Sequence, residues 1–203
     1  MAGRWRELLL FPLLCGLAGQ ERSASQPSLT PFEKDGKWGY AGSRGEVVIP
    51  PRFLIAQDFS SEGIAAIVDQ AGWAYIDRTG AVIIRPFVFD NGPDYFREGL
   101  ARFTEGGKFG FFDRTGKIVI RPTFTFARPF SGGLAAVCEG CKEEAAGEHR
   151  LVRGGKWGFI DRKGVLVVPP KFDEAEDFRG GSARVKAGGK WQRIDRKGKA
   201  PGS

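Results

Sequence analysis

Short runs in which apolar and polar residues alternate follow one another along most of the chain. In the run from 109 to 113, Phe109 and Phe111 fall on one face of an extended strand and Phe112 falls on the other. A period of two is typical of a β-strand, and the glycines that separate the runs indicate tight turns. We therefore expect an all-β protein made of short strands.

Two sequence markers recur along the chain at the same spacing. The first is an aromatic residue that, in most copies, is followed by a small residue and a second aromatic residue. Its leading aromatic residues are Trp38, Trp73, Phe109, Trp157 and Trp191, which are 35, 36, 48 and 34 residues apart. The second marker is a phenylalanine followed three or four residues later by a glycine, and its glycines are Gly63, Gly99, Gly133 and Gly181. Because both markers share one spacing, the chain contains a repeat of roughly 35 residues.

Each repeat is expected to form a three-stranded β-meander. In one copy the first strand covers 100–103, the second 109–113 and the third 118–120. The turn before the third strand reads Asp-Arg-x-Gly, in which an aspartate oxygen accepts a backbone N–H and glycine ends a type I turn. The turn aspartates are Asp77, Asp113, Asp161 and Asp195. A proline follows every third strand and, because it lacks an N–H, is expected to end strand pairing there.

The repeats are expected to stack as an open, elongated or curved array over residues 30–203, with about four full units and a partial one. A small closed propeller is the alternative, although a repeat of this length is short for a propeller blade of about 40–45 residues. From marker glycine to leading aromatic residue there are 10 positions in three units, but 24 between Gly133 and Trp157. An insertion of 14 residues therefore lies within 137–155.

One stretch of the chain carries a family resemblance. Residues 156–173 read Lys-Trp-Gly-Phe-Ile-Asp-Arg-Lys-Gly-Val-Leu-Val-Val-Pro-Pro-Lys-Phe-Asp. This stretch resembles a unit of the WG repeat family of bacterial proteins, also called KWG repeats, and the resemblance extends from about Lys34 to Gly198. It implies a repeat scaffold with a binding or structural role and no catalytic residues. The end units depart from the pattern, because Gly42 replaces the turn aspartate and Gln192-Arg193 replace the glycine and the second aromatic residue.

Residues 1–25 have the pattern of a signal peptide. Arg4 and Arg6 precede an apolar run over 8–18, and cleavage is conceivable after Ala18, Gly19 or Ala24. The run is much shorter than the roughly 20 residues that span a bilayer. Leucines precede Cys15 where lipoprotein signals have small residues, which argues against lipid attachment. We expect an exported protein, periplasmic or secreted, with no transmembrane segment once the signal is removed.

Charge narrows the class of partner. The chain has 203 residues, of which 31 are lysine or arginine and 24 are aspartate or glutamate, so its formal net charge is +7. A basic chain suits an acidic partner such as an anionic polymer or a lipid headgroup, whereas export argues against nucleic acid. His149 is the single histidine, and the chain has none of the common nucleophile or phosphate-loop motifs. We expect a protein that is not an enzyme and needs no cofactor.

Equivalent positions of stacked repeats form rows, and two rows are candidates for binding. The turn arginines Arg78, Arg114, Arg162 and Arg196 would form a basic row able to bind a polyanion. The alternative is a solvated charged edge that prevents strand-to-strand aggregation. The second row is Trp38, Trp73, Trp157 and Trp191. These tryptophans are expected to be core side chains, with an aromatic ladder for sugars or bases as the alternative.

The insertion holds Cys138, Cys141 and His149. In an exported protein, a disulfide between Cys138 and Cys141 at the base of the loop is the favoured interpretation. A metal site would need a fourth ligand beyond the two cysteines and His149. Thiol-redox chemistry or a pair of unpaired thiols would also fit this spacing. The sequence as a whole thus predicts an exported, non-enzymatic repeat scaffold that binds a protein or an anionic envelope polymer, and the alternative function is a metal or thiol-redox site in this loop. The oligomeric state stays open.

Overall fold

The computed structural model describes residues 28–146 and 149–200, and within these residues the chain forms β-strands and turns without a helix. No helix among them could therefore cross a membrane. The strands form a series of small antiparallel sheets. The first two sheets comprise β1 (Thr30–Lys34), β2 (Lys37–Ala41) and β3 (Val47–Phe53), then β4 (Ile55–Ala56), β5 (Ala65–Asp69), β6 (Gly72–Ile76) and β7 (Val82–Ile84). The all-β prediction is confirmed.

The remaining sheets follow the same plan, with two added hairpins. The third sheet comprises β10 (Leu100–Glu105), β11 (Lys108–Asp113) and β12 (Ile118–Phe124), preceded by the hairpin of β8 (Val88–Phe89) and β9 (Gly92–Pro93). The fourth comprises β13 (Phe126–Ala127), β14 (Leu134–Glu139), β17 (Lys156–Asp161) and β18 (Leu166–Phe172), and the inserted residues form the hairpin of β15 (Lys142–Ala146) and β16 (His149–Arg153). The fifth comprises β19 (Glu174–Ala175), β20 (Ser182–Ala187) and β21 (Lys190–Asp195).

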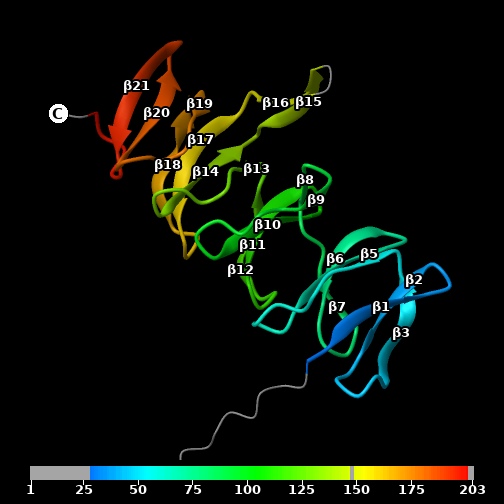
Figure 1. The fold of residues 1–203 in the computed structure, drawn as a ribbon. Helices are drawn as coiled ribbons and strands as arrows, with labels where there is room; N and C mark the ends of the chain where they lie inside the picture. The colour runs from blue at the N-terminus through cyan, green and yellow to red at the C-terminus, as the bar shows by residue number, and fades with distance from the viewer. Residues whose placement is uncertain (1–27, 147–148, 201–203) are drawn as a thin grey trace, which may run out of the picture.

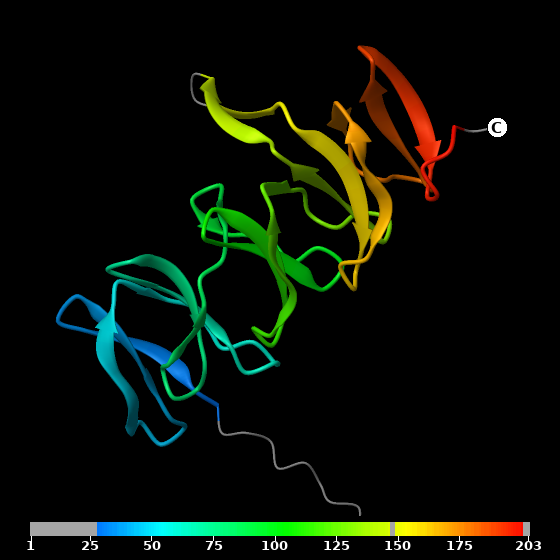
Figure 2. The ribbon, with the colours of Figure 1, turned by 180° about the vertical axis from the view of Figure 1, so that it is seen from behind.

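The sheets follow one another along an open array, and the first and last sheets lie at opposite ends (Figures 1 and 2). The open arrangement expected from the repeat is therefore confirmed, and the closed propeller is not what the chain forms. The third strands β3, β7, β12 and β18 succeed one another along one long side of the array. The hairpins β8–β9 and β15–β16 lie on the other side (Figure 1). The two long sides are thus built from different parts of the repeat.

The hydrophobic cores lie between neighbouring sheets. On β11, Phe111 packs with Ile160 of the following sheet, whereas Phe112 packs with Tyr75 of the preceding sheet. The rings of Tyr75 and Phe112 have centroids 5.7 Å apart. The alternation of the second strand places its side chains on opposite faces, so each strand contributes to two cores. Every internal sheet is therefore buried on both faces.

A glycine in the second strand allows the third strand to cross it closely. A Cβ built on Gly158 would lie 2.7 Å from the nitrogen of Pro170, and one on Gly110 would lie 2.6 Å from the carbonyl oxygen of Ile120. The prediction that proline ends strand pairing is wrong in three units, because β3, β12 and β18 continue through their prolines to a phenylalanine. A bulge absorbs the prolines, as the pairs Trp157–Phe172 and Phe159–Val168 show.

The Asp-Arg-x-Gly turns form as predicted. The Oδ1 atom of Asp195 accepts the N–H groups of Lys197 and Lys199, at 2.8 and 2.9 Å. The N–H of Lys199 has the largest effect on the pKa of Asp195 and lowers it, and with the N–H of Lys197 it outweighs the opposing effect of desolvation. The aspartate therefore accepts these bonds in its ionised form at neutral pH. Gly198 adopts a positive φ of 76° and packs on Val168 of the preceding sheet.

The outer face of the last sheet is polar. Arg193 occupies the position of the core residues Phe111 and Phe159, and it is exposed. Trp191 is 41% exposed, whereas Trp157 at the equivalent position is 3% exposed. The expectation that Trp191 is a core residue is therefore wrong, because no sheet packs over it among the described residues. The guanidinium of Arg184 covers its ring instead, at 4.9 Å from the ring centroid.

Candidate functional site: a cleft along the link segments

A cleft of about 800 Å³ lies along the segments that join one sheet to the next. We call these the link segments, and the three that line the cleft are 87–97, 125–131 and 173–179. They are equivalent stretches of three successive units. Their cleft-lining residues are Phe89, Asp94, Tyr95, Arg97, Phe126, Arg128, Pro129, Phe130, Ser131, Glu174, Ala175, Glu176, Asp177 and Arg179. The cleft is therefore a product of the repeat itself.

The walls of the cleft carry aromatic side chains at different depths. Trp157 is buried and lies under the guanidinium of Arg128, which is 5.6 Å from the ring centroid. Phe89, Tyr95 and Trp191 are exposed at the rim. Exposed rings beside arginines offer flat apolar contact area together with charge.

The first link segment is held in place by a buried ion pair. The side chains of Asp94 and Arg102 are 2% and 5% exposed. The carboxylate of Asp94 accepts hydrogen bonds from Nε and Nη2 of Arg102, at 2.9 and 2.7 Å. Nη1 of Arg102 donates to the carbonyl oxygen of Ala127, at 3.0 Å. The guanidinium also stacks on Phe87 and Phe89, with its carbon 4.8 and 5.9 Å from the ring centroids. This pair fixes both the hairpin β8–β9 and its contact with the next link segment.

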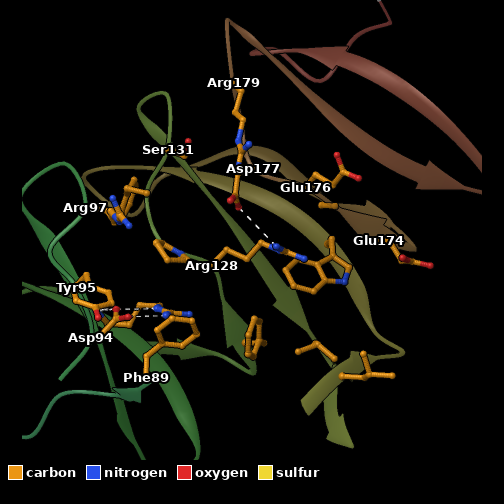
Figure 3. Close-up of a pocket in the computed structure, with 18 of the residues that line it drawn as sticks. Phe89, Asp94, Tyr95, Arg97, Arg128, Ser131, Glu174, Glu176, Asp177 and Arg179 are labelled. Atoms are coloured by element: carbon orange, nitrogen blue, oxygen red, sulfur yellow. Dashed lines mark hydrogen bonds and ion pairs between the residues drawn. The ribbon is translucent and has the colours of Figure 1, made fainter. Parts of the chain in front are cut away.

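The acidic residues of the cleft all have basic partners. Besides Asp94, they are Glu174 with Lys186, Glu176 with Arg184, and Asp177 with Arg128, at 2.8, 3.3 and 4.0 Å. The last pair is loose, and both Nε of Arg128 and Oδ1 of Asp177 are buried without a hydrogen-bond partner. Figure 3 shows this pair, with Arg179 on the far side of Asp177.

Two arginines of the cleft remain without an ion-pair partner among the described residues. Arg97 and Arg179 directly follow the marker phenylalanines of their units, and Ser131 occupies the same position in the unit between them. Both arginines are exposed, and both side chains appear at the cleft in Figure 3. Because the acidic residues are already paired, the unpaired charge that the cleft offers to a ligand is positive.

Comparison with known protein families identifies the repeat. The family model described as WG containing repeat matches residues 38–70, 73–109, 109–142 and 157–191. These four segments cover well over half of the chain. The chain belongs to the WG repeat family. No curated protein matches the chain. Membership in this family indicates a repeat-containing binding module, but it does not identify the partner that the module binds.

The predicted arginine row of this WG array lies outside the cleft, at the joints between sheets. Arg78 and Arg114 place their guanidinium carbons 5.4 and 5.2 Å from the ring centroids of Phe59 and Phe96. The other two members are Arg162, whose guanidinium lies near Gly99, and Arg196, whose guanidinium lies against Gly133 of the preceding unit. The four arginines therefore occupy equivalent places in the WG array, and their role in ligand binding stays a prediction.

The inserted hairpin separates the residues that a metal site would need. The Cα atoms of Cys138 and Cys141 are 5.8 Å apart and their sulfur atoms are within disulfide-bonding distance, at the base of the hairpin. His149 pairs with Ala146 at the opposite end of the hairpin. Several strand residues, each of which spans roughly 3.3 Å, separate this end from the cysteines. The WG array thus brings the two cysteines together but not the histidine. No group of three potential metal ligands occurs among the described residues.

Sequence reasoning missed the buried pair and the unpaired cleft arginines. One signal was available, because Pro86 and Phe96 are 10 positions apart, whereas the equivalent residues of the other WG units, such as Pro122 and Phe130, are 8 apart. The two extra residues form the turn of β8–β9, where Asp90 and Asn91 adopt positive φ. Nothing in the repeat pattern indicates that three link segments enclose one cleft.

Proposed function

We propose that this protein is an exported, non-enzymatic binding module, and that the cleft along the link segments holds an anionic ligand, either an acidic segment of a protein or an envelope polymer. The observation that carries the proposal is the pair of arginines Arg97 and Arg179, which lack ion-pair partners among the described residues and flank a cleft whose acids are already paired. The arrangement favours binding over acid–base catalysis. The guanidinium groups of Arg97 and Arg179 donate hydrogen bonds but do not exchange protons near neutral pH.

The chemistry of the cleft supports an extended anionic ligand. A guanidinium binds a carboxylate or a sulfate with two parallel hydrogen bonds, which favours oxyanions over neutral groups. Arg97, Ser131 and Arg179 repeat one position along three link segments, so polar groups recur along the cleft. Tyr95 and Trp191 supply flat surfaces at its rim. A linear chain with repeated acidic groups matches this arrangement better than a compact small molecule does.

The double variant Arg97→Gln/Arg179→Gln is expected to weaken binding of an anionic polymer at least about tenfold, since hydrogen bonds to charged groups contribute about 1.5–3 kcal/mol each. Titration calorimetry with poly-L-glutamate and, separately, polygalacturonate measures the affinity and tells a polypeptide ligand from a polysaccharide. The matched control is Arg162→Gln/Arg196→Gln, which removes the same charge from the turn row. Equal losses in the two variants would show that overall charge or the turn row accounts for the binding, and would contradict the cleft as the site.

Export is expected to leave two marks on the mass of the protein recovered from the cell envelope. The chain should begin after Ala18, Gly19 or Ala24, because the apolar run over 8–18 resembles a signal that is removed. It should also be two hydrogens lighter than its reduced form, because an oxidising compartment joins Cys138 to Cys141. Intact-mass spectrometry before and after reduction checks both marks. A chain that starts at Met1 and has both Cys138 and Cys141 reduced would contradict export.

A further inference from the structure

The side of the array opposite the cleft carries a row of exposed aliphatic residues. Each third strand begins with two of them, and in β3 they are Val47 and Val48. The other pairs are Val82 and Ile83, Ile118 and Val119, and Leu166 and Val167. These eight side chains, which we call the aliphatic row, are between 37% and 57% exposed. Single exposed aliphatic residues are ordinary, but the same pair in four successive units is a patterned apolar surface.

Basic residues surround the aliphatic row. In four units, the turn before the third strand and the third strand itself form the stretches 42–53, 77–85, 113–121 and 161–171. In the last unit the equivalent turn is 195–199. Together they contain 13 basic and 5 acidic residues, an excess of eight, whereas the whole chain has a net charge of +7. The turns and third strands that contain the aliphatic row therefore carry an excess of positive charge. Of these basic residues, Lys117, Arg121, Lys163 and Lys171 are exposed.

The backbone on this side is a poor template for a further strand. The third strands are edge strands of their sheets, but prolines follow their apolar residues, as Pro50 and Pro51 do in β3. Proline offers no N–H, so an added strand could pair over only a short stretch. A second copy of the chain is also disfavoured, because facing rows would bring two concentrations of like charge together. A partner that binds here must therefore contact apolar side chains and positive charge without adding a strand to the sheets.

We infer that the aliphatic row docks this protein on the surface of an anionic lipid bilayer. The aliphatic side chains enter the boundary between headgroups and acyl chains, and the surrounding lysines and arginines contact anionic headgroups. The four third strands lie along one long side of the array (Figures 1 and 2), so the aliphatic row follows that side from unit to unit. The hairpins β8–β9 and β15–β16, which contribute Phe89, Leu151 and Val152 to the cleft, lie on the other side (Figure 1). Membrane docking and ligand binding are thus assigned to separate surfaces, and either can fail without the other.

The test measures partition onto lipid vesicles by co-sedimentation. The wild-type chain is expected to bind vesicles that contain phosphatidylglycerol and not vesicles of phosphatidylcholine alone, and high salt is expected to weaken the binding. The variant Val47→Thr/Val82→Thr/Ile118→Thr/Leu166→Thr keeps side chains suited to strands, and we expect its affinity for the vesicles to fall at least about tenfold, since binding scales with buried apolar area. Because residues 8–18 are themselves apolar, all chains compared share one N-terminus.

Matched variants separate docking from general effects. Ile55→Thr/Val88→Thr makes the same chemical change at exposed positions outside the third strands, and we expect it to bind vesicles like the wild type. Lys117→Gln/Arg121→Gln/Lys163→Gln/Lys171→Gln should weaken binding to anionic vesicles and reduce its dependence on salt. Unchanged binding by the fourfold threonine variant would overturn the inference, as would equal binding to neutral vesicles. A concentration-dependent dimer that this variant abolishes would also overturn it, because the row would then join two copies.

Discussion

Replacing Asp94 with asparagine is expected to lower the free energy of unfolding by about 3–5 kcal/mol, because the change leaves a buried guanidinium without its counter-charge. Arg102 is buried, and its two hydrogen bonds to Asp94 of 2.9 and 2.7 Å depend on the carboxylate. The hairpin β8–β9 should also loosen, since the same guanidinium stacks on Phe87 and Phe89. Urea unfolding of the wild type and the variant measures the difference.

Glu176 provides the control for this experiment. It occupies the position of Asp94 two units later, and its partner Arg184 occupies the position of Arg102, but the side chains of Glu176 and Arg184 are 45% and 49% exposed. Glu176→Gln should therefore change stability by no more than about 1 kcal/mol. The double change Asp94→Asn/Arg102→Ala should recover part of the loss, because it removes the unpaired charge and places alanine where Ala66 and Ala136 occur naturally. Equal effects of Asp94→Asn and Glu176→Gln would show that burial does not control the strength of this pair.

Gly158→Ala is expected to destabilise the fold by about 3 kcal/mol, because the added methyl group would overlap the backbone of the crossing strand. Its Cβ would lie 2.7 Å from the nitrogen of Pro170 and 2.9 Å from the carbonyl carbon of Pro169. Both neighbours are backbone atoms of a paired strand, so they cannot move aside as a flexible side chain could. Thermal and urea unfolding should show the loss, together with an altered near-ultraviolet circular dichroism signal from Trp157, which pairs across from Phe172.

Gly92→Ala is the matched control for that prediction. A Cβ on Gly92 would have the carbonyl oxygen of Phe89 as its nearest neighbour, at an ordinary contact distance of 3.9 Å. This change should alter stability by about 0.5 kcal/mol or less. The second unit offers a natural comparison, because Ala74 stands at the position of Gly158 and its third strand β7 stops at Ile84, before the proline. A Gly158→Ala protein as stable as the wild type would mean that the crossing can widen without cost.

Local pattern was sufficient for most of the fold. The alternation around Phe111 and Phe112, the Asp-Arg-x-Gly turns and the repeat spacing each depend on residues close in sequence, and the structure has the strands and the turns that they predict. The proline prediction failed because a proline lacks a donor but still tolerates a bulge, and the glycine of the facing strand leaves room for one. The exposure of Trp191 depends on whether another sheet covers it, which no local pattern reports.

The candidate site was harder to predict than the fold. The sequence directed attention to Arg78 and its equivalents because they recur in every unit, whereas Arg97 and Arg179 alternate with Ser131 and so form no uninterrupted row. The pairing of Asp94 with Arg102 depends on a link segment that is longer than its equivalents, and only the folded backbone shows that the extra length turns the aspartate inward. Site residues of this kind depend on departures from the repeat.

The cores that lie between sheets have a consequence for how such a chain can evolve. Each joint is made by one face of one sheet and the opposite face of the next, so duplicating or deleting a whole unit re-forms the same joint at the new boundary. Array length is therefore free to drift by complete units, while a shift by part of a unit would leave half a core open to water. The cleft does not share this freedom, because it needs three particular link segments in order. Gene rearrangements should accordingly preserve 87–179 as a block and vary the units that precede it.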